Sequence, residues 1–143
     1  MIAHAIYPRW PVLVFGLLAA CQSGSPSEPL SIQSNKKPTD VVVAIAKVAQ
    51  KCWFKSGDPV FKPFKLANET NSYGGRPRFL LVKRNNPGGL PLLVVQAELR
   101  GSASSGKYTH IQTFGPLLET QNGKRISTDV RRWSRGNSSC KEA

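Results

Sequence analysis

The sequence has few of the residues and motifs on which metal and nucleophilic catalysis depend. Its 143 residues include two histidines, His4 and His110, and contain none of the patterns HExxH, CxxC or GxSxG. A zinc site needs several His, Cys or carboxylate ligands at suitable spacing, and many serine hydrolases carry their nucleophile on GxSxG. We therefore predict no metal, no cofactor and no catalytic residue, although composition alone leaves a Ser/His/Asp triad through His110 open.

Acidic residues are also scarce. Eight Asp and Glu stand against 20 Lys and Arg, which gives a formal net charge of +12 and a pI of about 10.1. The carboxylates are isolated along the sequence, so the paired carboxylates of a glycosidase or murein hydrolase are not indicated. The excess of cations favours an anionic partner, which by charge alone is nucleic acid, phosphorylated lipid or an acidic polymer.

The basic residues gather in short clusters, which are our candidates for anion binding. Arginine is suited to this role because its guanidinium group matches phosphate and carboxylate oxygens in pairs. A solvated charged surface without a ligand is the alternative. The candidate residues are Arg76, Arg78, Lys124, Arg125, Arg131, Arg132 and Arg135, with the contact face centred on Arg131, Arg132 and Arg135.

The N-terminus lacks an apolar run long enough to span a membrane. The run at residues 12–20 is far shorter than the roughly 20 residues that a spanning helix needs. A single basic residue, Arg9, precedes this run and small residues end it, which is typical of a secretory signal peptide. We therefore predict a signal peptide at residues 1–20.

Residues 18–21, Leu-Ala-Ala-Cys, resemble the lipobox of bacterial lipoproteins, and the resemblance covers residues 1–22. It implies that Cys21 carries a diacylglycerol, begins the mature chain and anchors it in the cell envelope. Gln22 in place of aspartate resembles the pattern of outer-membrane lipoproteins that face the periplasm. A location in the cell envelope disfavours nucleic acid as the partner and leaves anionic lipid, glycan or protein. An ordinary secreted protein with a cysteine near its cleavage site is the alternative.

The stretch after Cys21 and the two other cysteines complete this interpretation. Residues 21–38 are rich in Ser and Pro and bury too little apolar surface to fold, so we expect a disordered tether. Once Cys21 is set aside, Cys52 and Cys140 form an even pair, which predicts a disulfide in an oxidising compartment. Two unpaired thiols are the alternative.

The remaining chain, residues 39–143, has the pattern of a single small α+β domain. Apolar residues at helical spacing predict a helix over 39–54, capped by Thr39, and a short helix around 126–133. Four strand-like runs lie between them, and Pro63 places the first at an edge. The short connections predict an antiparallel four-stranded meander in a two-layer fold, covered by both helices. The strands are expected at residues 60–67, 78–84, 90–99 and 107–114.

These features favour a lipid-anchored envelope lipoprotein with a non-enzymatic basic binding domain. The domain is expected to bind envelope anions on lipid, lipopolysaccharide or peptidoglycan. The alternative is a protein-partner module, such as an assembly subunit or an inhibitor, with an aromatic patch around Trp53, Phe54 and Phe61 as its surface. A hydrolase that uses His110 is the third hypothesis.

Overall fold

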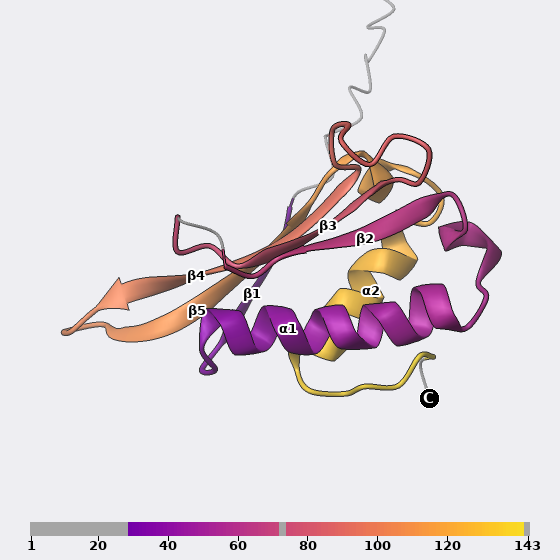
Figure 1. Ribbon diagram of the computed structural model, residues 1–143. Helices are drawn as coiled ribbons and strands as arrows, with labels where there is room; N and C mark the ends of the chain where they lie inside the picture. Colours follow the sequence, from indigo (N-terminus) through magenta and orange to yellow (C-terminus); the bar gives the residue numbers. More distant parts are fainter. Residues whose placement is uncertain (1–28, 72–73, 142–143) are drawn as a thin grey trace, which may run out of the picture.

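The computed structural model describes residues 29–71 and 74–141, which form two layers. A five-stranded antiparallel sheet makes one layer, and helices α1 and α2 pack on one face of it, as the sequence predicts for the helices (Figure 1). Neither these helices nor the shorter ones in the described ranges are long and apolar enough to cross a bilayer. In chain order the elements are β1 Leu30–Ser34, α1 Pro38–Ala49, the π-helical turn Gln50–Lys55, the 3-10 turn Pro59–Phe61, β2 Phe64–Glu69, β3 Arg78–Lys83, β4 Leu93–Ser102, β5 Gly106–Phe114, the 3-10 turn Pro116–Glu119 and α2 Gly123–Ser134.

The sheet has one strand more than the four that the sequence predicts. Its order is β1-β5-β4-β3-β2, so β2 to β5 form the expected meander and β1 is added beside β5. Leu30 and Ile32 alternate with Ser31 and Gln33, which places two apolar side chains against the core while β1 pairs with the edge of β5. The prediction of a disordered tether up to residue 38 is therefore wrong from Leu30 onward.

The signal peptide, Cys21 and the rest of the predicted tether up to residue 28 lie outside the described residues. The structure therefore bears on the folded domain and on the last part of the tether. The described residues start at Pro29, directly before β1.

Strand β2 is the other edge of the sheet, in agreement with the position of Pro63 just before it. The strand begins later than predicted because residues 59–61 form a 3-10 turn instead. Asp58 stabilises this turn, since its Oδ1 accepts a hydrogen bond from the backbone N–H of Val60 at 3.0 Å. The turn brings Phe61 into the core, where it is fully buried.

Helix α1 buries the apolar stripe that its sequence predicts, but its start differs. The N-cap residue is Lys37 rather than Thr39, and no side chain caps the helix. Pro38 occupies the first turn, where its fixed φ suits a helix start and its missing N–H has no helical partner to lose. The π-helical turn that follows brings Cys52 and Trp53 into the core. The buried residues of α1 are Val41, Val42, Ile45, Ala46 and Ala49.

Helix α2 begins where the chain packs against the turn that precedes it. A Cβ atom on Gly123 would lie 1.8 Å from the carbonyl oxygen of Leu118, so no larger residue fits at this position. The helix is followed by Gly136, whose φ of +91° turns the chain back along α2. The apolar side chains predicted to face the core are all buried: Ile126, Val130 and Trp133.

An aromatic cluster fills the core between the two helices. The ring of Trp53 stacks on Phe61 with 4.7 Å between centroids, and it lies 4.9 Å from the ring of Trp133. Trp53 and Phe61 are 0% and 1% exposed. The prediction of a partner-binding aromatic patch around Trp53, Phe54 and Phe61 is therefore wrong, because two of the three rings belong to the core and Phe54 is half-buried.

No helix of the described residues covers the second face of the sheet (Figure 1). Leu80, Val82 and Val94 form a small buried cluster on it, with Ala67 packed alongside. Phe114 lies on the same face opposite Val94, and polar and charged side chains predominate beyond it, because they alternate along β4 and β5 with the residues that point into the core. We call this surface the open face of the sheet.

Candidate functional site

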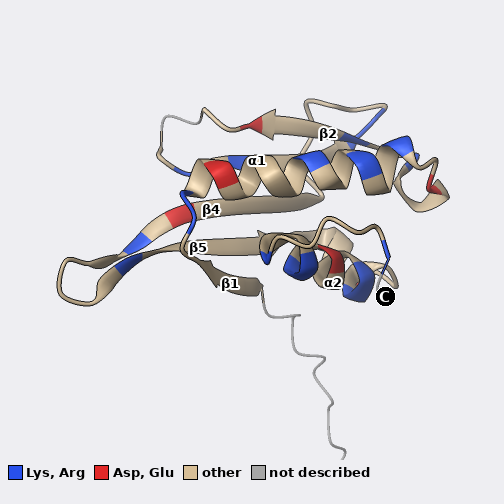
Figure 2. Cartoon of the chain, turned by 90° about the horizontal axis from the view of Figure 1, so that it is seen from below, with Lys and Arg blue, Asp and Glu red and all other residues tan. Residues whose placement is uncertain are grey.

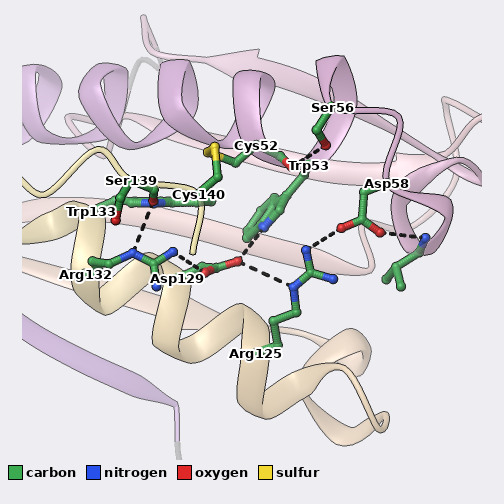
Figure 3. A network of polar contacts seen from close by, with 11 residues as sticks. Cys52, Trp53, Ser56, Asp58, Arg125, Asp129, Arg132, Trp133, Ser139 and Cys140 are labelled. Atoms are coloured by element: carbon green, nitrogen blue, oxygen red, sulfur yellow. Dashed lines mark hydrogen bonds and ion pairs between the residues drawn. A yellow bond between two sulfur atoms is a disulfide. The ribbon is translucent and has the colours of Figure 1, made fainter. Parts of the chain in front are cut away.

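A hollow beside α2 brings together several of the cations that the sequence predicts for that helix. Its volume is about 690 Å³, and it lies between α2, the turn at Asp58 and the C-terminal segment. Figure 3 shows the polar network along it, and we call it the α2 hollow. Its charged lining residues are Asp58, Lys124, Arg125, Asp129, Arg132 and Lys141.

The predicted disulfide between Cys52 and Cys140 is present and borders this hollow (Figure 3). The two Cα atoms are 5.1 Å apart, although the residues are 88 positions apart in the sequence. The bridge ties the C-terminal segment to the turn after α1, and this segment also bonds to α2. The carbonyl of Ser139 accepts hydrogen bonds from Arg132 Nε at 3.2 Å and from Trp133 Nε1 at 2.9 Å.

Asp129 is the centre of the polar network and is only 4% exposed. Its Oδ2 accepts a hydrogen bond from Trp53 Nε1 at 2.8 Å, and its Oδ1 accepts one from Arg132 Nη2 at 2.5 Å. Oδ2 also lies 3.9 Å from Arg125 Nε. A buried carboxylate needs such partners because an isolated charge is poorly solvated there. Asp129 was not among the residues predicted for this site, although its spacing from Arg125 and Arg132 on one helix is a usable signal.

The second carboxylate of the hollow is Asp58, which holds Arg125 from the opposite side. Its Oδ2 accepts a hydrogen bond from Arg125 Nη2. Burial raises the pKa of Asp58, but the hydrogen bonds from Arg125 and from the Val60 N–H, with the charge of Arg125, outweigh it and lower the pKa overall. Asp58 is therefore ionised at neutral pH, and it orients the guanidinium group of Arg125.

Three of the predicted cations, Lys124, Arg131 and Arg135, are exposed on the same helix or at its end. Within residues 29–71 and 74–141, no carboxylate lies within ion-pair distance of their side chains. Figure 2 shows basic residues on both sides of the single acidic residue of α2. We call the cations of this helix the α2 surface, which comprises Lys124, Arg125, Arg131, Arg132 and Arg135.

The other two predicted anion-binding residues, Arg76 and Arg78, lie away from the α2 surface. They contact carboxylates on the open face, where Arg76 Nε is 2.8 Å from Glu98 Oε2 and Arg78 Nη2 is 2.6 Å from Glu69 Oε2. The sheet lies between these arginines and α2, so the seven predicted residues do not form one face. Their separation follows from the alternation of side chains along a strand, which places Arg78 on the face of β3 that points away from the core.

The open face also holds His110, the histidine considered as a catalytic base. Its Nε2 lies 2.6 Å from Oγ of Ser31 in β1, and its Nδ1 lies 3.8 Å from Oε1 of Glu98 in β4. Within the described ranges Nδ1 has no hydrogen-bond partner. A serine, a histidine and a carboxylate thus lie in a row across three strands. Neither here nor elsewhere in the described residues do three His, Cys, Asp or Glu gather as metal ligands.

The carboxylate in this row is already bound by arginines. Arg100 Nε donates a hydrogen bond to Glu98 Oε1 at 2.6 Å, and Arg76 binds the other oxygen. The hydrogen bond from Arg100 lowers the pKa of Glu98 against the effect of burial, and the charges of Arg100, Arg76 and His110 lower it further. A catalytic triad needs the carboxylate to accept a hydrogen bond from histidine Nδ1, and 3.8 Å is beyond that range.

Neither Ser31 nor Glu98 was predicted as a neighbour of His110. Glu98 stands directly opposite His110 in the register of β4 and β5, so a correct pairing of the two predicted strands identifies it. Ser31 lies on β1, the strand that was not predicted, and is 79 positions away from His110. Its contact with His110 depends on β1 joining the sheet.

Comparisons with known proteins add no relative to these observations. No family model, no curated protein and no solved structure matches the chain. The function is therefore inferred from the geometry of the described residues and from the resemblance of the N-terminus to a lipobox.

Proposed function

We propose that the chain is a lipid-anchored protein of the cell envelope whose domain binds anionic groups through the α2 surface. The proposed anchor is Cys21, at the outer membrane and facing the periplasm, and the binding function needs neither catalysis nor a cofactor. The observation that carries the proposal is the set of exposed cations on α2, Lys124, Arg131 and Arg135, which no carboxylate within the described ranges neutralises.

The charge of the α2 hollow supports an anionic ligand. Its charged lining consists of four cations and two carboxylates, a net charge of four minus two, or +2. Asp58 and Asp129 hold the guanidinium groups of Arg125 and Arg132 in place. A guanidinium group that is already oriented loses less conformational entropy when its remaining N–H groups bind a phosphate or carboxylate.

The length of the α2 surface favours a ligand with several anionic groups over a single small ion. Lys124 and Arg135 are 11 positions apart, which corresponds to about 16 Å along a helix. Lipid headgroups, the phosphates of lipopolysaccharide and the carboxylates of peptidoglycan present anions in such arrays. Nucleic acid has the same charge, but the proposed location in the envelope makes it a less suitable partner.

Reversing two charges of the α2 surface tests this proposal. We expect Arg131→Glu with Arg135→Glu to weaken binding to purified peptidoglycan sacculi by at least roughly tenfold, equal to about 1.4 kcal/mol. The attraction is electrostatic, so binding of the unmodified surface should also fall as salt rises. Co-sedimentation over a range of salt concentrations measures both effects, with the mature chain carrying Cys21→Ser so that acylation does not contribute.

A matched pair on α1 separates a local site from the net charge. Lys47→Glu with Lys51→Glu changes the net charge by the same amount and lies on exposed positions of the other helix and its π-helical turn. We expect a chain with these two substitutions to bind nearly as well as the unmodified chain. An equal loss for both pairs would contradict a binding site on α2 and leave only a non-specific effect of charge.

A second candidate function, a serine hydrolase, has one observation in its favour. Ser31 Oγ and His110 Nε2 are 2.6 Å apart, which is the contact that activates a serine nucleophile. The binding of Glu98 by two arginines argues for a structural role of this row instead. Labelling of Ser31 by a fluorophosphonate probe that is lost in His110→Ala would favour the hydrolase, and we expect no labelling.

A further inference from the structure

The end of the sheet at which the chain enters the domain has a distinct composition. Leu30 begins β1 there and pairs with Thr113, and Phe114 ends β5 there and pairs with Val94. The loop between β3 and β4, residues 84–92, lies at the same end (Figure 1). We call this region the tether end, because the segment that leads back to Cys21 joins the sheet here.

The tether end carries the most exposed large apolar side chain in the described ranges. Leu90, in the loop between β3 and β4, is 89% exposed, and Phe114 is 37% exposed. The loop is closed by a hydrogen bond from the Gly89 N–H to the Asn86 carbonyl at 3.1 Å, so Leu90 is presented by a tight turn. The remaining exposed large apolar residue, Leu99, lies in β4 toward its hairpin with β5, at the opposite end.

Cations lie at the same end of the sheet, around the start of β2 and the end of β3. Lys62, Lys65 and Lys83 are exposed, and within the described residues no carboxylate lies within ion-pair distance of them. Arg84 is held in place by hydrogen bonds to the carbonyls of Lys62 at 3.1 Å and Phe64 at 3.0 Å. An exposed leucine at the same end of the sheet as three lysines and an arginine suits contact with the interface of an anionic membrane.

The length of the tether keeps this end close to the proposed anchor. Because β1 takes up residues that were expected to be tether, only nine positions separate Cys21 from Leu30. Nine residues span at most about 30 Å even when fully extended. If Cys21 is acylated, the tether end is the part of the described domain that the anchor holds nearest to the bilayer.

We propose that the tether end is a membrane-contact surface, in which Leu90 enters the headgroup region and Lys62, Lys65, Lys83 and Arg84 contact lipid phosphates. The proposal rests on the proposed lipid anchor for its biological setting. The contact itself does not need the anchor, because the leucine and the cations belong to the folded domain. Such a contact fixes the orientation of the domain on the membrane and leaves the α2 surface, on the helix layer, for a separate anionic ligand.

A fluorophore at position 90 tests the contact directly. The probe is the mature chain with Cys21→Ser and Leu90→Cys, labelled with an environment-sensitive dye and mixed with vesicles of phosphatidylcholine, with and without phosphatidylglycerol. We expect the emission to rise and shift to the blue with the anionic vesicles alone. The same dye at Leu99→Cys, at the opposite end of the sheet, should not respond. An unchanged emission at position 90, or an equal response at position 99, would overturn the proposal.

Charge variants separate this contact from the function proposed for α2. We expect Leu90→Glu to weaken binding to the anionic vesicles by at least tenfold, and Leu99→Glu, its matched control, to leave it unchanged. Arg131→Glu with Arg135→Glu should leave the dye response at position 90 in place. Loss of the response in that pair, together with unchanged vesicle binding of Leu90→Glu, would overturn the membrane contact while supporting binding through α2. Acylation of Cys21 is measured separately, so its absence would not be mistaken for loss of the contact.

Discussion

Replacing Asp129 with alanine is expected to lower the free energy of unfolding by about 3–5 kcal/mol, because its buried hydrogen-bond and ion-pair partners lose the carboxylate that they bind. The substitution leaves the indole N–H of Trp53 without an acceptor in the core, and it leaves Arg132 without its carboxylate. It also removes one of the two carboxylates that hold Arg125. The total stability of a domain of this size is only about 5–15 kcal/mol, so this single change is a large fraction of it.

Urea denaturation followed by tryptophan fluorescence measures the loss, and two variants serve as controls. Asp129→Asn keeps an oxygen acceptor for Trp53 while removing the charge, so we expect a smaller loss than for alanine. Glu119→Ala removes an exposed carboxylate, and its effect should stay within about 0.5 kcal/mol. If Asp129→Ala changed the free energy of unfolding by no more than Glu119→Ala does, the network would not stabilise the fold.

Removing the disulfide is the other change with a large expected effect. Replacing Cys52 and Cys140 with alanine opens a loop of 88 residues, which the chain-entropy model values at roughly 4–5 kcal/mol of stability. The physical cause lies in the unfolded chain, which gains conformations when the cross-link is absent. We also expect the C-terminal segment to leave α2, which removes the hydrogen bonds from Arg132 and Trp133 to Ser139.

Chemical denaturation of the mature chain with Cys21→Ser, with and without reductant, measures this effect without altering the core. The Cys52→Ala, Cys140→Ala variant should match the reduced chain and should not respond to reductant. A loss below about 1 kcal/mol in both cases would mean that the unfolded chain is already compact or that the bridge strains the fold. In binding experiments, the opened chain should also bind sacculi more weakly, since the segment bordering the α2 hollow is released.

Much of the fold follows from local patterns in the sequence. The helical spacing of Val41, Ile45 and Val48 predicts α1, and the loop with two glycines at positions 88 and 89 separates two predicted strands. Short connections between the later strands leave the meander as the simplest topology. The pairing of Cys52 with Cys140 follows from the cysteine count once Cys21 is assigned to an anchor.

Strand β1 was missed because its signal is short and lies in a stretch whose composition indicates disorder. Five residues with two apolar side chains are too few to outweigh the serines and prolines before them. What stabilises β1 is its partner, since Leu30 pairs with Thr113, which lies 83 positions later in the chain. A sequence pattern indicates the local conformational preference of a segment. It does not indicate that the edge of β5 is available for β1 to pair with.

The candidate site was predictable in its residue types but not in their states. Clusters of arginine identified α2 as basic, and the spacing of Asp129 from Arg132 is visible in the sequence. The contact of Arg125 with Asp58, which are 67 positions apart, depends on the tertiary fold. Which cations are neutralised and which stay free for a ligand therefore required the structure, as did the separation of Arg76 and Arg78 from α2.

The claim on which both proposed contacts depend for their setting is that Cys21 is acylated. Mass spectrometry of the N-terminal peptide, from full-length protein isolated from membranes of the cells that produce it, tests this claim most directly. We expect a peptide that begins at Cys21 and carries a diacylglycerol on its thiol, and we expect the modification to disappear in Cys21→Ser. A chain that retains residues 1–20, or an unmodified cysteine at its N-terminus, would contradict the lipid anchor.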